Sequence, residues 1–150
     1  MLSLVTGETT PVLIAKTALV TDPLSPEIQM LLPQMIETMH KEKGVGLAAT
    51  QIGLSLRVAV AEVENKIYYL INPEITSYSQ EKIIFEEGCL SLPKEYFSML
   101  RSEKITLKYL NEKGLPKKLR AEGFLAVVLQ HEVDHLDGIL IKHRHAKQQK

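Results

Sequence analysis

The sequence predicts a single α+β domain in which several strands are followed by one buried helix near the C-terminus. Strand-like runs rich in β-branched and aromatic residues occupy the middle of the chain. Helical periodicity appears once before these runs and once after them, and no linker or internal repeat separates the segments. The chain has 150 residues, of which 45% are hydrophobic, which is enough for one substantial core. Residues 1–150 are therefore expected to form one domain.

The N-terminal part of the chain is expected to contain an extended arm and an amphipathic helix. Residues 1–24 mix short apolar stretches with Thr, Gly and Pro, which suggests an arm that wraps around the domain. From Ser25, a candidate N-cap, apolar residues recur at helical spacing as far as Lys43. Pro33 lies inside this pattern and removes a backbone donor, so we expect it to kink or break the helix near Leu32.

A glycine-rich segment and a series of strands are expected to follow this helix. Residues 44–51, GVGLAATQ, could form an ordinary turn after the helix, or could let a backbone approach a substrate closely. Asn72 and Pro73 should end the second strand, because proline cannot donate to a sheet. The spacing of the first two strands indicates a hairpin. The predicted strands are residues 57–63, 67–71, 83–85, 105–110 and 118–121.

The last predicted helix contains the most informative motif of the chain, HEVDH. An apolar run from Phe124 leads into it, which favours a buried helix over residues 123–137. His131 and His135 would then project from one face, where two imidazoles can bind one metal ion. Glu132 is placed to act as a general base on a water molecule that the metal activates, rather than as a ligand. A solvent-exposed helix that carries two histidines by chance is the alternative that this motif alone leaves open.

The single cysteine is a candidate for the third metal ligand. A catalytic zinc-type site needs three protein ligands and one open position. Cys89 lies in a glycine-containing bend just after a strand, where it could face the last helix. A lone cysteine is also commonly a small buried hydrophobic residue. Gly138 is a suitable left-handed cap for the last helix, and the short tail beyond it is expected to be frayed and basic.

The composition argues against several other classes of protein. The 18 basic and 18 acidic residues balance, so no overall field favours nucleic acid or an anionic membrane. No stretch approaches the length of a membrane span, and one cysteine cannot form a disulfide within the chain. The N-terminal residues lack the pattern of a secretory signal or a transit peptide. We expect a soluble, cytoplasmic, monomeric protein.

Three short motifs give the chain a specific resemblance to the peptide deformylase family. GVGLAATQ at 44–51, EGCLS at 87–91 and QHEVDH at 130–135 resemble the family's motifs and occur in the same order. Weaker similarity extends from about Pro11 to Ile141. The resemblance implies one catalytic domain with mixed, mainly antiparallel sheets around a central helix. It also implies hydrolysis of the N-formyl group from the initiator formyl-methionine of nascent polypeptides.

The resemblance implies the metal ligands and the ion. Cys89, His131 and His135 would bind one divalent metal ion, and Glu132 would transfer protons. The family points to Fe²⁺, whereas a thiolate with two imidazoles suits zinc as well as iron. Zn²⁺, Ni²⁺ and Co²⁺ are the other candidates.

Further residues are expected to bind the substrate. By the resemblance, Gln51 and the backbone N–H of Leu90 would hydrogen-bond the oxygen that becomes negative, and Gly46 would lend its backbone to the substrate chain. Gly88 and the metal would leave room for a formyl group but little room for a larger acyl group. The methionine side chain would lie against an apolar slot near the two histidines. This slot is formed by Val45, Phe124, Val127 and Val128.

The chain departs from the family in several places. Relatives usually have Asp-Pro-x-Leu-Arg near the start, whereas residues 10–14 read TPVLI and end in Ile14. Tyr96 stands where many bacterial relatives place an arginine near the substrate cleft, and Arg101 further on fits that pattern. Pro33 is unexpected in the first helix. The C-terminal helix that can dock on the ribosome is almost absent, so the sequence does not predict ribosome contact.

Other classes of protein remain open at this point. A zinc endopeptidase also uses HExxH, but its third ligand usually lies downstream, where Asp137, His143 and His145 are the available side chains. A different amidohydrolase would use the same chemistry. The last alternative is a non-catalytic, deformylase-like binding module, although none of the chemical positions has been replaced.

Overall fold

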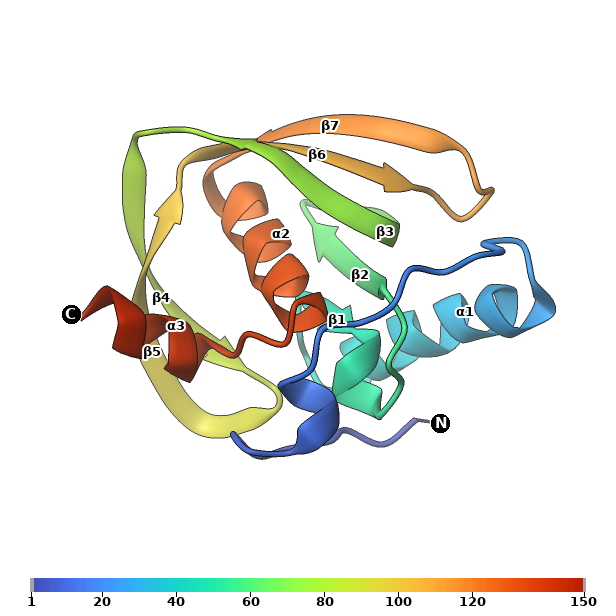
Figure 1. Cartoon of the computed structure of the whole chain (residues 1–150), viewed down its shortest axis with the longest axis horizontal. Helices are drawn as coiled ribbons and strands as arrows, with labels where there is room; N and C mark the ends of the chain where they lie inside the picture. Colours follow the sequence, from blue (N-terminus) through green and yellow to red (C-terminus); the bar gives the residue numbers. More distant parts are fainter. Residues whose placement is uncertain (1, 150) are drawn as a thin grey trace.

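Two antiparallel sheets and three α-helices make up the structure, a computed structural model that describes residues 2–149 (Figure 1). The strands are β1 (Gly46–Ala48), β2 (Val58–Val63), β3 (Lys66–Tyr78), β4 (Lys82–Cys89), β5 (Leu92–Ser102), β6 (Lys104–Leu110) and β7 (Pro116–Glu122). The helices are α1 (Pro26–Lys41), α2 (Gly123–Leu136) and α3 (Ile141–Gln148), with 3₁₀ helices η1 (Pro11–Leu13) and η2 (Ala49–Ile52). None of the helices described combines the length and apolarity needed to cross a membrane.

The sheets surround α2, which contains the HEVDH motif. The larger sheet has the strand order β1-β2-β3-β6-β7, and β4 pairs with β5 in a separate two-stranded sheet. The pairs between these strands are all antiparallel. In Figure 1, α2 lies in the middle of the molecule, with β6 and β7 above it and β4 and β5 to its left. The predicted α+β class, with mainly antiparallel sheets around the HExxH helix, is confirmed.

The side chains of β2 alternate between two buried clusters on opposite faces of the larger sheet. Ala59 and Ala61 belong to the cluster that includes α2, whereas Val58 and Val60 belong to the cluster that includes α1. This alternation follows from the two-residue period of a strand. Because the alanines are small, α2 can lie close to the sheet. The buried apolar residues of α2 in this cluster are Ala126, Val128, Leu129, Val133 and Leu136.

Helix α1 begins as predicted but does not break at its proline. The Ser25 hydroxyl accepts a hydrogen bond from the backbone N–H of Ile28 at 3.4 Å, which caps the helix. The expected break near Leu32 is wrong, since one helix continues through Pro33. Pro33 is exposed, so water can satisfy the carbonyl group that its missing N–H leaves unpaired.

Strand β3 continues past the point where the sequence was expected to end it. Asn72 and Pro73 lie within β3, which reaches Tyr78, and the register with β6 shifts at this point. The missing donor of Pro73 therefore falls in an irregularity of the ladder. Asn72 has a φ of 53° and holds the N-terminal arm. Its side-chain oxygen accepts from the N–H of Val20 at 2.7 Å, and its amide donates to the Val20 carbonyl at 2.9 Å.

Two of the longer elements in the structure, β5 and α3, were not predicted by the sequence analysis. β5 pairs with β4 along its length, and α3 replaces the frayed tail that was expected. Leu140 and Ile141 begin this last segment and are buried in a small cluster with Leu13. Further along, the Gln148 side chain both accepts from the Leu100 N–H and donates to the Leu100 carbonyl, each at 3.0 Å. These tertiary contacts stabilise a helix that is otherwise polar.

Gly138 ends α2 in the predicted left-handed conformation, with a φ of 75°. A Cβ atom at this position would lie 2.7 Å from the carbonyl carbon of Ile14. The glycine therefore both caps the helix and allows the N-terminal arm to pass close to it.

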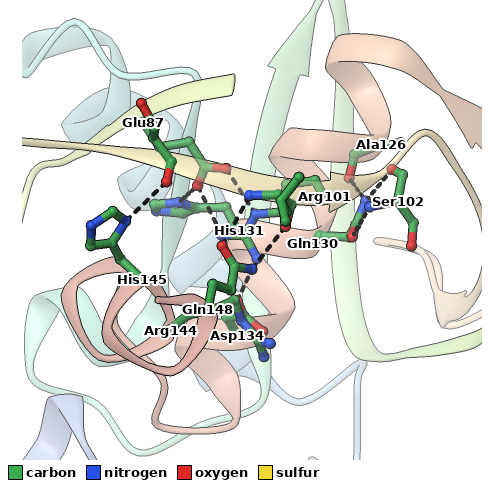
Figure 2. A network of polar contacts seen from close by, with 12 residues as sticks. Glu87, Arg101, Ser102, Ala126, Gln130, His131, Asp134, Arg144, His145 and Gln148 are labelled. Carbon is green, nitrogen blue, oxygen red and sulfur yellow. Dashed lines mark hydrogen bonds and ion pairs between the residues drawn. The ribbon is translucent and has the colours of Figure 1, made fainter. Parts of the chain in front are cut away.

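Gln130 is expected to contribute strongly to stability, because its buried amide pairs with the backbone of Ser102 at the end of β5 (Figure 2). Its Oε1 accepts from the Ser102 N–H at 3.1 Å, and its Nε2 donates to the carbonyls of Ser102 at 2.8 Å and Ala126 at 3.0 Å. Replacing Gln130 with Met keeps the size but leaves the Ser102 groups unpaired, so the free energy of unfolding should fall by about 1–3 kcal/mol. Gln34→Met on the exposed face of α1 is the matched control. If urea unfolding showed the same loss of unfolding free energy for Gln130→Met and Gln34→Met, the prediction would be contradicted.

Candidate metal centre

Cys89, His131 and His135 form a Cys-His-His metal site at the junction of β4 and α2. The Cys89 Sγ lies 3.2 Å from the Nε2 of His135, and this nitrogen lies 3.1 Å from the Nε2 of His131. The three ligand atoms all lie within 4.8 Å of one another. The two histidines are one helical turn apart on α2, as the spacing predicted. A thiolate with two imidazoles suits a divalent transition metal.

An irregularity in the β4–β5 sheet turns Cys89 toward α2. The register shifts between Gly88 and Cys89, and Cys89 then pairs with Leu92 across a tight turn. A Cβ atom at Gly88 would lie 2.7 Å from the ring of the exposed Tyr96, so a side chain there would displace this ring. The Glu-Gly-Cys sequence therefore places a thiol at the end of a strand and aims it at the histidines.

The charges around Cys89 favour its thiolate form. Burial acts to raise the pKa of the thiol, but the charges and hydrogen bonds of His135 and His131 outweigh it and lower this pKa to about 5. The thiolate is the form that binds metal ions. At neutral pH the side chain is therefore already prepared for ligation.

Glu87 orients the first histidine ligand, a role that the sequence analysis did not assign. Its Oε1 accepts a hydrogen bond from the Nδ1 of His131 at 3.0 Å, which leaves the Nε2 of His131 for the metal (Figure 2). Arg101 donates to both carboxylate oxygens of Glu87 at 2.8 Å. Burial acts to raise the pKa of Glu87, but these hydrogen bonds lower it to about 2. Its place in the EGCLS motif, two residues before Cys89, was the signal available in the sequence.

Glu132 lies in a buried position beside β1. Its side chain is almost completely buried, and its Oε1 has no hydrogen-bond partner among the described residues. The carboxylate packs against Gly46, where any Cβ atom would overlap it. Burial raises the pKa of Glu132, which favours a carboxyl group that can hold a proton. Glu132 follows His131 on α2, and both side chains line the same pocket.

Gln51 presents its amide to the metal site from η2. Its Oε1 accepts from the backbone N–H of Ala48 at 2.9 Å, which fixes the direction of the amide. Its Nε2 donates to the Ser91 hydroxyl at 3.4 Å and points to the Cys89 sulfur at 3.7 Å. The side chain therefore offers a fixed donor beside the ligands. The sequence analysis did not assign a role to Ser91, although it belongs to the EGCLS motif.

A pocket of about 520 Å³ opens beside the metal site. The N-terminal arm contributes Leu4 and Thr6 to its wall, which no pattern in the sequence indicated. The catalytic candidates Gln51, Leu90 and Glu132 also line it. The predicted substrate-binding residues that line the pocket are Val45, Gly46, Gly88, Phe124, Val127 and Val128.

Two arrangements that the sequence allowed, an arginine beside the substrate cleft and a metal ligand downstream of His135, are not found among residues 2–149. Tyr96 lines the pocket, whereas Arg101 does not. The guanidinium group of Arg101 is buried and donates a hydrogen bond to Glu87. The downstream candidates for an endopeptidase-type ligand also lie elsewhere. Asp137 pairs with Arg57 at 2.8 Å, and His143 and His145 belong to α3.

Comparisons with known proteins agree with this architecture. The family model described as polypeptide deformylase matches residues 2–150. A peptide deformylase of Picosynechococcus sp. is 42% identical over 123 residues, which cover 79% of this chain and 66% of that protein. The crystal structure of the Thermotoga maritima peptide deformylase has 40% sequence identity and a TM-score of 0.92, and the match covers 96% of this chain and 97% of that one.

A third related protein is a class I type b peptide deformylase from Acinetobacter baumannii, whose crystal structure has Met-Ala-Ser bound. It is 34% identical, with a TM-score of 0.92, and the match covers 96% of this chain and 98% of that one. The family model spans nearly the whole sequence, and the fold is the same as in these structures. This chain therefore belongs to the polypeptide deformylase family.

Proposed function

We infer that this protein hydrolyses the N-formyl group of N-formylmethionyl peptides, the initiator end of nascent polypeptides. The observation that carries this inference is the arrangement of the Cys-His-His site, the buried Glu132 and the Gln51 amide around one pocket. Amide hydrolysis needs an activated water, a polarised carbonyl and a proton for the departing amine. The site contains a group suited to each of these tasks. We further propose that residues 1–150 act as one catalytic domain, as a monomer, in the cytoplasm.

Cys89, His131 and His135 would hold the metal ion, and their donor set fits this role. When bound, the ion supplies Lewis acidity, which lowers the pKa of a water molecule and polarises the formyl carbonyl. We propose Fe²⁺ as the native ion because the family resemblance favours it, with Zn²⁺, Ni²⁺ and Co²⁺ as alternatives. Glu87 supports the site by fixing the tautomer of His131.

Glu132 would move the proton. Its Oε1 has no hydrogen-bond partner among the described residues and its side chain lines the pocket, so it can take a proton from the attacking water. The raised pKa of the carboxyl group helps it to keep this proton until the amine leaves. Delivery of the same proton to the amine nitrogen completes the cycle.

Gln51 and Leu90 would stabilise the negative charge that develops on the formyl oxygen. The Gln51 amide is already held in place by Ala48, so it need not reorganise when the charge appears. Leu90 follows Cys89 in the turn between β4 and β5 and lines the pocket, where its backbone N–H would be the second donor.

The substrate chain would lie along β1. This strand is at the edge of the larger sheet, so one side of its backbone is unpaired with any other strand. An extended peptide can add to such an edge through main-chain hydrogen bonds. Gly46 would provide these contacts, and the methionine side chain would enter the slot formed by Val45, Phe124, Val127 and Val128. The Met-Ala-Ser bound by the Acinetobacter protein supports a peptide of this kind.

The first prediction about the site concerns the thiol ligand. Changing Cys89 to Ser replaces a soft thiolate with a poor metal ligand, so metal affinity should fall by more than roughly tenfold and activity should fall with it. Metal content after purification without oxygen, together with turnover of formyl-Met-Ala-Ser, measures both effects. A variant that retains its metal and turns over at the wild-type rate would remove Cys89 from the site.

The second prediction separates proton transfer from metal binding. Glu132→Gln keeps the shape of the side chain but cannot carry a proton, so kcat should fall roughly 10²- to 10⁴-fold while metal content is unchanged. Glu37→Gln, on the exposed part of α1, is the matched control and should leave kcat unchanged. Loss of metal from the Glu132 variant at normal stability would instead identify Glu132 as a ligand.

The third prediction concerns the choice of substrate. Each methylene that the methionine side chain buries is worth about 0.8 kcal/mol, so kcat/KM for formyl-Met-Ala-Ser should exceed that for formyl-Ala-Ala-Ser by roughly 10- to 100-fold. Acetyl-Met-Ala-Ser should react far more slowly, because its extra methyl group would have to fit between the metal ligands and Gly88 in the pocket lining. Similar values for all three peptides would favour a general amidohydrolase, and no turnover of any of them would favour a binding module.

A further inference from the structure

A chain of alternating charges connects α3 to the metal ligand His131 (Figure 2). Arg144 donates from Nε and Nη2 to the two carboxylate oxygens of Asp134, at 2.6 and 2.8 Å. Arg101 donates from Nη1 to the Oδ2 of Asp134 at 2.6 Å and holds Glu87 with its other nitrogens. Glu87 in turn accepts the hydrogen bond from His131. Three ion pairs and one hydrogen bond therefore lead from the C-terminal helix to the site.

We propose that Arg144 is a positioning residue for the metal site, which it affects through Asp134, Arg101 and Glu87. The proposal rests on the metal site of the proposed function. Arg144 does not line the pocket beside the metal, so this role needs no contact with the substrate.

Arg144 balances the buried charges of this network, in which each carboxylate needs a guanidinium partner. The side chains of Arg101 and Glu87 are 3% and 5% exposed, and that of Asp134 is 13% exposed. Charges at such depth need partners, because little water is available to solvate them. Two carboxylates share two guanidinium groups. Without Arg144, Asp134 would depend on Arg101 alone and would compete with Glu87 for it.

Loss of Arg144 would affect His131 through the contacts of Arg101 and Glu87. Glu87 keeps its position under His131 because two nitrogens of Arg101 hold its carboxylate. A shift of Arg101 toward Asp134 would weaken its hydrogen bonds to Glu87. The Glu87 carboxylate could then move, and the His131 ring would be free to rotate. Asp134 itself lies on α2, between the two histidine ligands in the sequence. The orientation of a ligand histidine depends on contacts of this kind.

The helix α3 has other anchors that do not touch this network. Gln148 pairs with the backbone of Leu100 through both ends of its amide, and the Nδ1 of His145 lies 2.9 Å from the Ser98 carbonyl. Gln148→Ala therefore loosens the docking of α3 on β5 without changing the charges near the site. It is the matched control for Arg144.

The experiment measures how fast the nickel-loaded protein releases its metal to an excess of chelator. Arg144→Gln should release nickel about tenfold faster than wild type, at the low end of what supporting contacts to a ligand are worth. Gln148→Ala should stay within about twofold of wild type, because the charge network is intact. Arg144→Lys keeps the charge but loses the bidentate contact with Asp134, so its rate of nickel release should lie between those of wild type and Arg144→Gln. Thermal unfolding of each variant monitors the fold.

A double variant tests the charge argument directly. Asp134→Asn combined with Arg144→Gln removes the carboxylate that would compete for Arg101, so nickel release should return to within a few-fold of wild type. Equal acceleration by Arg144→Gln and Gln148→Ala would overturn the proposal, since α3 would then act only by docking. A double variant as fast as Arg144→Gln would also overturn it. Nickel release needs no formylated peptide, so failure of deformylation in wild type would count against the proposed function alone.

Discussion

The close approach of α2 to the larger sheet is the constraint on which the rest of the site depends. Ala59 and Ala61 on β2 leave room for the helix, and Gly46 on the neighbouring strand leaves room for the Glu132 carboxylate. A side chain at Gly46 would push against the helix that carries both histidines and would move them from Cys89. The same approach removes Glu132 from water, which is the physical cause of its raised pKa. The close approach of α2 to the sheet therefore determines both the packing of the helix and the raised pKa of Glu132.

The opposite side of α2 meets charged groups instead of small apolar ones. Arg101 and the two carboxylates that it contacts are buried together, and the desolvation of such groups offsets much of their mutual attraction. Such groups therefore contribute less to stability than their attraction alone suggests, and each contact fixes a direction as well as a distance. The contacts of α2 with the larger sheet therefore set its distance from the sheet. Its contacts with the charged groups on the opposite side set the orientation of its side chains.

The sequence revealed the features that depend on local periodicity and missed those that depend on distant partners. His131 and His135 were found because helical spacing alone places them together, and Cys89 because it is the only thiol in the chain. Glu87 was overlooked because its role requires Arg101, which pairs with it only across the β4–β5 sheet. Likewise, α3 is polar, and the contacts of Gln148 that hold it are tertiary. No local periodicity connects the two members of such a pair.

The two edges of the larger sheet are protected from uncontrolled pairing in different ways. The β7 edge presents Lys117, Lys118 and Arg120, all exposed, and such charges discourage another strand from docking there. The β1 edge has no such charges, but it is only three residues long, which is too short to template the growth of an aggregate. A guest that joins this edge would be recognised through its main chain, which every polypeptide shares. An enzyme built in this way could accept newly made chains of very different sequence and still remain soluble beside them.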